Sequence, residues 1–244
     1  MRQKRFAIQL KIHGWKFVAL AFVATSALLI FVWFNLPRWV ERLPWPASLP
    51  LSGGKFFEKK VLISLPHYSQ WDPLWGLDQL GNTSSTLAEE GCAVSAAAMA
   101  LSAKGANLNP GQLNALLTQH QNGYTQEGWI YWETAAAVAL PGKISCVYEG
   151  PADYLRIDTE LLRGNPVILR LRLPSNKTHF VVVVGKEAME YLINDPADGK
   201  GSDLRRLSSV GGEITGMRFY LEREPFWNRH FLVKVPNNAR AQKN

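Results

Sequence analysis

One apolar segment near the N-terminus constrains the chain more than any other. Residues 17–34 read FVALAFVATSALLIFVWF, which is 18 residues without a charge, and Asn35 and Leu36 extend the uncharged run to 20. A helix of about 20 residues crosses the hydrocarbon core of a bilayer. We therefore expect a transmembrane anchor over residues 17–36. A cleaved signal peptide is the alternative, but its apolar region would be shorter and would be followed by small residues, whereas Trp33, Phe34 and Trp39 stand here.

The charges outside this segment predict its orientation. Residues 1–16 hold five basic residues and residues 226–244 hold four, both without an acid, so the net charge of +7 leaves −2 for the rest of the chain. Basic residues before a membrane helix favour a cytoplasmic N-terminus, which places the remainder on the extracytoplasmic side. Because the folded part carries no excess of positive charge, we do not expect it to bind nucleic acid.

The remainder divides into a linker, one domain and a tail. Residues 37–54 are rich in Pro, Ser and Gly, as linkers are, the domain is expected over 55–225, and 226–244 form a basic tail. Helical patterns precede most of the strand patterns, which predicts a segregated α+β fold with an antiparallel sheet. The expected helices cover 92–104, 110–119, 127–139 and 158–164, and the expected strands cover 61–64, 144–148, 166–173, 178–185, 190–194 and 214–222.

Cys92 is the first candidate for chemistry. It follows Gly91 and opens the helical run CAVSAAAMALSA. The unpaired N–H groups of a helix N-terminus favour the thiolate form of a thiol placed there. Two other interpretations stay open: an ordinary buried residue, or a disulfide with Cys146, the only other cysteine.

A nucleophilic cysteine needs a base, and His179 is the best placed of the five histidines. It stands at the start of THFVVVVG, whose run Val181 to Val184 indicates a strand buried on both faces. The next strand pattern ends at Asn194-Asp195. If the two strands form a hairpin, Asp195 lies beside His179 and orients it. Asp195 has a simpler interpretation as a turn residue before proline.

The loop before the cysteine, LPHYSQWDPLWG at 65–76, offers a hydrogen-bond donor for an oxyanion. A glutamine amide placed there stabilises the charge that forms when a thiolate attacks a carbonyl. Gln70 is the candidate and Gln79 its rival, with the backbone N–H of Cys92 as a second donor. We expect Trp71 and Trp75, together with Asp72 of the same loop, to hold this loop in place.

These four segments, in this order, resemble the C39-like peptidases, a branch of the papain-like cysteine proteases: YSQWDPLW, GCAVSAAAMAL, THFVVVVG and INDPADG. The resemblance covers about residues 60–200. It implies a papain-like fold with Cys92 as nucleophile, His179 as base, Asp195 as orienting residue and Gln70 as oxyanion donor. The family often has Gly and then Pro after the cysteine, where this chain has Ala93 and Val94.

The resemblance and the anchor together predict a membrane-anchored cysteine peptidase that hydrolyses peptide bonds in a peptide or protein substrate. No cofactor and no metal are expected, because the sequence has neither an HExxH motif nor clustered Cys and His residues. Two alternatives use the same fold: a binding module that has lost activity, and an amidase or acyltransferase that works through the same Cys–His pair.

Overall fold

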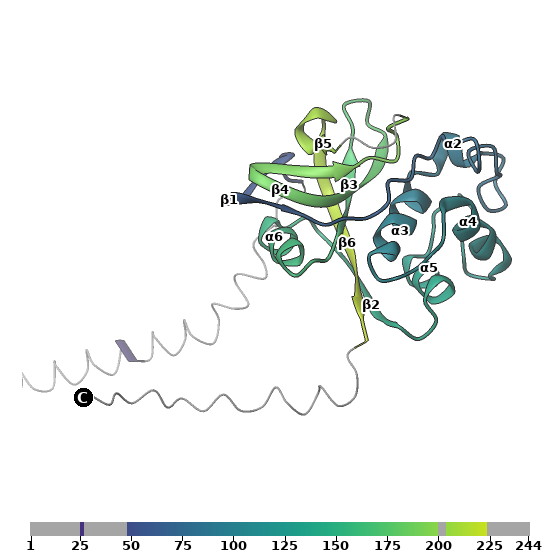
Figure 1. Ribbon diagram of the computed structural model, residues 1–244, viewed down its shortest axis with the longest axis horizontal. Coiled ribbons are helices and arrows are strands. Elements are labelled where there is room, and N and C mark those ends of the chain that lie inside the picture. The colour runs from purple at the N-terminus through teal and green to yellow at the C-terminus, as the bar shows by residue number, and fades with distance from the viewer. Residues whose placement is uncertain (1–24, 27–47, 200–203, 224–244) are drawn as a thin grey trace, which may run out of the picture. The chain divides into compact units, whose positions relative to one another are not determined.

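The computed structural model describes residues 25–26, 48–199 and 204–223, and it divides the chain into two compact units, Met1–Pro46 and Ala47–Asn244. The expected anchor at 17–36 lies outside the described residues except for 25–26, and so do both basic tails and most of the linker. Within the described ranges, no helix has the length and apolar character that crossing a membrane requires. The helices and strands labelled in Figure 1 all belong to the second unit.

The first half of this unit is helical. Its helices are α2 (Leu87–Glu90), α3 (Cys92–Ser102), α4 (Pro110–Gln119) and α5 (Trp132–Ala139). The sequence explains where they begin: Asn109 caps α4, its side chain accepting from the Gln112 N–H, with Pro110 at the first helical position as predicted. The prediction for α5 was wrong at its start, because the residues before Trp132 form a bridge between Tyr124 and Ile130 instead of a helical turn.

The other part of this unit is an antiparallel sheet, as predicted, and its first strand precedes the helices along the chain. Its strands are β1 (Ser52–Leu62), β2 (Ile144–Gly150), β3 (Val167–Arg172), β4 (Thr178–Asn194), β5 (Arg205–Arg206) and β6 (Glu213–Glu222). The order across the sheet is β1-β4-β3-β6-β2, and β5 pairs with the end of β4. Helix α6 (Tyr154–Leu162) connects β2 to β3, and a short 3-10 helix, η1 (Leu207–Ser209), follows β5. β1 is longer than the expected strand at 61–64, and α6 begins earlier than expected, where Asp153 caps it.

β4 joins into one element the two strands that the sequence predicted at 178–185 and 190–194. An extended strand of that length would span about 50 Å at ~3.3 Å per residue. Yet the side chains of His179 and Asp195, near its two ends, are 2.7 Å apart. The strand therefore reverses direction, and Ala188, with a φ of 52°, marks the turn. The predicted neighbourhood of the two residues is confirmed, although the structure assigns a single strand.

The sheet is buried on both faces, as the apolar run of β4 indicated. On one face, Phe180, Val182 and Val184 pack against the helical half. On the other, Val181 and Val183 belong to a second core that includes residues of α6 and η1. Figure 1 shows α3, α4 and α5 gathered on one side of the sheet, with α6 beside β1.

Helix α3 packs directly on β4, and its small side chains make that contact close. The alanines at 96, 97, 98 and 100 are at most 2% exposed. Alanine leaves room for the helix backbone to approach the strand without leaving a cavity. The close packing brings the start of α3, with Cys92, next to the start of β4, with His179.

Candidate active site

Cys92 is the first residue of α3 and a free cysteine that is partly exposed. The disulfide alternative is therefore wrong for this thiol. Gly91 before it is required by close packing, because a Cβ there would lie 2.4 Å from the Leu87 carbonyl oxygen. No side chain caps the helix at Gly91, so the first N–H groups of α3 lack a side-chain acceptor. The sulfur and these donors lie at the same helix end.

His179 bridges Cys92 and Asp195. Its Nε2 lies 2.7 Å from Oδ1 of Asp195, in a setting where His179 is 8% exposed and Asp195 is 2% exposed. Cys92 is close enough to the imidazole to contribute to the raised pKa of His179. Since Nε2 is occupied by the carboxylate, Nδ1 is the ring nitrogen left for the sulfur. The structure thus brings together the three residues that the sequence predicted as nucleophile, base and orienting acid.

The pKa of His179 follows from these contacts. Burial alone would lower it, but the hydrogen bonds from Asp195 and Cys92, together with their charges, outweigh burial and raise the pKa of His179 to about 9. The imidazole thus keeps its proton at neutral pH. A protonated imidazole can supply a proton to a leaving group.

Asp195 is held by more than the histidine. Its Oδ1 also accepts from the Ala197 N–H at 2.9 Å, and its Oδ2 accepts from Nη1 of Arg205 at 2.9 Å. Burial raises the pKa of a carboxyl group, but here His179, the Ala197 N–H and Arg205 outweigh it and lower the pKa of Asp195. The carboxylate stays charged and fixed in orientation. Its turn role before Pro196 is compatible with this, because Asp198 N donates to the Asp195 carbonyl at 3.0 Å.

The loop at 65–76 is joined to both sides of the site. On one side, the Gln70 N–H donates to the Pro196 carbonyl at 2.8 Å, and the ring Nε2 of His67 lies 2.9 Å from the Asp195 carbonyl. On the other side, Nε2 of Gln70 and Nε1 of Trp71 both donate to the Ala88 carbonyl, at 2.7 and 2.9 Å. The loop is thereby fastened beside the nucleophile.

Gln70 is buried and uses one of its two amide N–H groups on Ala88, four residues before Cys92. The amide nitrogen carries a second N–H group, and the amide oxygen is buried without a hydrogen-bond partner among the described residues. The rival, Gln79, is exposed and donates to the carbonyl of Thr83 within its own loop. Gln70 thus contacts the segments that precede Cys92 and follow Asp195, whereas the side-chain contact of Gln79 lies within its own loop.

The aromatic residues hold the loop as expected. Nε1 of Trp75 donates to the Ser69 carbonyl at 2.8 Å, and Asp72 accepts from the Leu74 N–H at 3.0 Å. Two residues of the site escaped the sequence analysis, His67 and Arg205. Arg205 carries no local signal, because it reaches Asp195 only through the pairing of β5 with β4. His67 stood in the quoted loop, but nothing in the sequence indicated which carbonyl it would contact.

Comparisons with known proteins point to one family. The model of the Peptidase_C39 like family matches residues 62–212, which is more than half of the chain. No curated protein matches it. Among solved structures, a putative C39-like peptidase from Bacillus anthracis is 18% identical, with a TM-score of 0.43, over 68% of this chain and 98% of that one. The peptidase domain of Streptococcus ComA, a bifunctional ABC transporter involved in a quorum-sensing pathway, is 22% identical, with a TM-score of 0.39, over 54% of this chain and 90% of that one.

Proposed function

Because the chain belongs to the Peptidase C39-like family, we propose that it is a cysteine peptidase that hydrolyses peptide bonds with Cys92 as the nucleophile. The observation that carries the proposal is the line of contacts from Asp195 through His179 to a free, partly exposed Cys92. A histidine so placed can exchange a proton with the sulfur and supply a proton to a leaving amine.

The proposed reaction uses only groups of this chain and water. The Cys92 thiolate attacks the carbonyl carbon of the scissile peptide bond, and the charge that develops on its oxygen is stabilised by the Cys92 backbone N–H and the free amide N–H of Gln70. The His179 imidazolium gives its proton to the leaving nitrogen, which departs as an amine. The neutral imidazole then takes a proton from water, and the resulting hydroxide attacks the thioester. The carboxylic acid is released, and the thiolate is restored beside the imidazolium.

Asp195 keeps the imidazole in one orientation throughout this cycle. Its 2.7 Å contact with Nε2 leaves Nδ1 directed to the sulfur, and Arg205 keeps the carboxylate ionised. The substrate is a peptide or protein. We also propose that residues 17–36 anchor the enzyme in a membrane by a single span, with the peptidase domain outside the cytoplasm, on the strength of the charge-free run and the basic residues before it.

The direct test is the reactivity of the thiol and its link to hydrolysis. Iodoacetamide should modify Cys92 at neutral pH faster than it modifies a free peptide cysteine, and Cys92→Ala should abolish cleavage of a peptide library. Gln70→Ala should lower kcat by about 10²–10³-fold, since one oxyanion donor is lost. Gln79→Ala is the matched control, because the Gln79 side chain is exposed and donates to the Thr83 carbonyl of its own loop.

Two outcomes would overturn the proposal. A Cys92 that reacts no faster than a free peptide thiol would indicate a binding module without activity. Cleavage that survives Cys92→Ala would assign the chemistry to another group. Hydrolysis of small amides with no cleavage of any peptide would instead favour the amidase alternative.

A further inference from the structure

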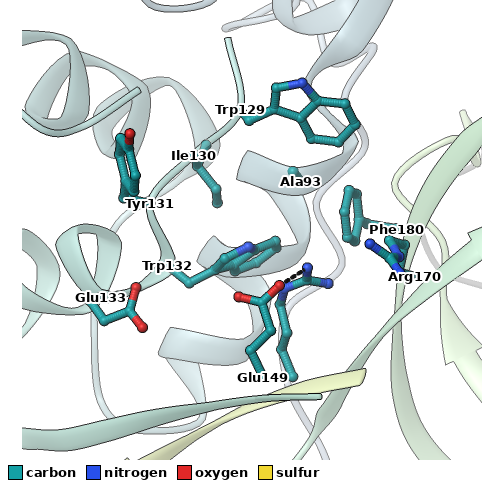
Figure 2. A pocket seen from close by; sticks show the side chains of 10 residues that line it. Ala93, Trp129, Ile130, Tyr131, Trp132, Glu133, Glu149, Arg170 and Phe180 are labelled. Atoms are coloured by element: carbon teal, nitrogen blue, oxygen red, sulfur yellow. Dashed lines mark hydrogen bonds and ion pairs between the residues drawn. The ribbon is translucent and has the colours of Figure 1, made fainter. Parts of the chain in front are cut away.

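Next to the proposed catalytic residues, a cavity of about 230 Å³ lies between the sheet and the helical half. Its lining residues are Ala93, Trp129, Ile130, Tyr131, Trp132, Glu133, Glu149, Arg170, Phe180 and Arg218. Figure 2 shows Trp129 and Trp132 on one side of the space and Phe180 with Arg170 on the other. None of these residues takes part in the reaction proposed above, so the cavity needs its own explanation.

Arg218 is a buried, positively charged residue of β6, and it lines this cavity. It is 5% exposed, and its guanidinium carbon lies 4.8 Å from the ring centroid of Trp132 and 5.1 Å from that of Phe180. Its Nη2 donates to Glu149 on the neighbouring strand, the ion pair drawn in Figure 2. Two further donors, Nε and Nη1, are buried and have no hydrogen-bond partner among the described residues. Unpaired donors on a buried cation are costly, and they are relieved when a ligand brings an acceptor.

Arg170 adds a second positive charge at the exposed rim. Its Nε and Nη2 donate to the hydroxyl and carbonyl oxygens of Thr215, both at 3.1 Å, which fix its guanidinium. Arg170 and Arg218 are close enough that the charge of Arg170 disfavours the protonated form of Arg218 and lowers its pKa, although burial is the largest cause of that lowering. An anion between the two guanidinium groups would relieve this repulsion.

The cavity also has two acids, and both lie toward solvent. The side chain of Glu149 is 49% exposed while it pairs with Arg218, and Glu133 is exposed at the start of α5. Water screens the charge of exposed carboxylates. Arg218 lies between two aromatic rings that keep water from its guanidinium group, so its charge is screened less. The buried end of the cavity is therefore positive and its outer edge is mixed.

The position of the cavity relates it to the scissile bond. Ala93 directly follows Cys92, and Phe180 directly follows His179. Consecutive Cα atoms are about 3.8 Å apart, so the walls of the cavity at Ala93 and Phe180 belong to the backbone segments that carry Cys92 and His179. We infer that a side chain a few residues from a peptide bond held at Cys92 reaches the cavity. The exposed indole of Trp129 and the ring of Tyr131 offer apolar surface for the methylene groups of such a side chain.

We propose that this cavity is a specificity pocket that binds the carboxylate of an aspartate or glutamate side chain in the peptide substrate, close to the cleaved bond. Arg218 binds the carboxylate at the buried end and Arg170 contacts it at the rim. The inference rests on the proposed peptidase function, since it places the pocket relative to Cys92. It makes the preferred substrate an acidic peptide.

The test compares sequence preference in cleavage with sequence preference in binding. A synthetic peptide library with Asp, Glu, Asn, Gln, Leu and Lys equally represented at every position is digested by the full chain, and the residues around each cut are identified by mass spectrometry. We expect Asp or Glu to be favoured over Gln and Leu by about tenfold in kcat/KM at one position near the cut, which corresponds to about 1.4 kcal/mol. The same library is then passed over the Cys92→Ala protein, which binds without cleaving, and the retained peptides are sequenced.

Two variants and one control assign the preference to the pocket. Arg218→Met keeps a side chain between Trp132 and Phe180 and should remove the acidic preference. If Arg218→Met does not fold, Arg170→Gln at the exposed rim should still reduce the preference. Arg172→Gln is the control, because Arg172 lies on the same strand but pairs with Glu213 and does not line the cavity.

The outcomes separate this inference from the peptidase proposal. Cleavage without an acidic preference, or a preference unchanged in Arg170→Gln and Arg218→Met, overturns the pocket and leaves the peptidase standing. Retention of acidic peptides that depends on Arg218, with no cleavage by the parent protein, supports the pocket and overturns the peptidase. Retention with no acidic preference overturns the pocket even if nothing is cleaved.

Discussion

The proton on His179 determines how reactive the site is at a given pH. Burial lowers the pKa of His179, but two neighbours, Asp195 and Cys92, outweigh burial and raise the pKa to about 9. In the proposed mechanism, the protonated imidazole donates to the leaving nitrogen, so activity extends upward in pH until His179 loses its proton. We expect the upper limb of the pH–activity profile near pH 9.

Replacing the orienting acid should move that limb. In Asp195→Asn, the hydrogen bond to Nε2 loses its charge, and the pKa of His179 should fall from about 9 toward its ordinary value of 6.5. The measurement is an NMR titration of the His179 ring protons, with the pH dependence of kcat/KM beside it. Asp78→Asn is the control, since Asp78 is exposed. An unchanged titration in Asp195→Asn would show that Asp195 does not govern the histidine.

The same shift contributes to stability, with a definite sign. Because the folded-state pKa of His179 is higher than its ordinary value, the folded protein binds this proton more tightly than the unfolded chain does. This proton's contribution to the free energy of unfolding is complete below about pH 6.5 and is lost as pH rises through about 9. Asp195 has a lowered pKa, so its contribution to the free energy of unfolding has the opposite pH dependence. That contribution is lost as the pH falls and the carboxylate is protonated.

The sequence alone was sufficient for the residues whose meeting depends on local chain geometry. His179 and Asp195 were paired because a hairpin brings its two ends together. Gln70 is predicted as the donor because it lies in the loop before Cys92. In the structure its side chain donates to the Ala88 carbonyl, four residues before Cys92. Arg205 could not be found in this way, because its contact depends on how β5 returns to the sheet. The cavity at Arg218 could not be predicted from the sequence either, because its lining residues come from separate helices and strands.

At the scale of elements, β1 shows where sequence patterns are weak. The stretch SGGKFFEKKVL has no clear alternation, and only its end was expected as a strand. Its pairing with β4, which includes two irregularities in register, makes it extended. β1 is also secured by a buried cluster: Nζ of Lys186 donates to Asp158 and to the Gly53 carbonyl, both at 2.7 Å, and contacts the Tyr191 hydroxyl at 3.2 Å.

This buried cluster should control the stability of the sheet edge. Lys186 is 0% exposed and Asp158 is 1% exposed, so Lys186→Met leaves a buried, uncompensated carboxylate. We expect a loss of about 3–5 kcal/mol in the free energy of unfolding. Urea denaturation followed by circular dichroism measures it, with the exposed Lys177→Met as control. The double variant Lys186→Met/Asp158→Asn should lose less than Lys186→Met alone; an equal or larger loss would contradict the explanation by an unpaired charge.

On the scale of the whole molecule, charge and hydropathy separate the N-terminal segment from the domain. The basic residues of 1–16 precede the charge-free run at 17–34, and the part between the two basic tails is slightly acidic. This pattern needs no tertiary information, which is why the sequence supports a proposal about the anchor even though that segment lies outside the described residues.

Membrane attachment should depend on this segment alone. The full chain, expressed in a bacterial host, should sediment with membranes and resist extraction with alkaline carbonate, and deletion of residues 17–36 should release it. Protease added to spheroplasts should digest the domain if it faces outward. Release of the full chain by carbonate would contradict the anchor, and protection of the domain until lysis would reverse the proposed orientation.

The reversal of β4 has a consequence for how the chain acquires its reactivity. The base and its orienting acid are 16 residues apart and meet through one hairpin, whereas Cys92 lies 87 residues before His179. Local contacts of this kind close in microseconds, long before distant parts of a chain have docked. The thiol therefore stays unactivated until α3 has packed on β4. If the proposed function holds, a chain in which α3 has not packed on β4 lacks the contact between Cys92 and His179 and should not cleave its neighbours.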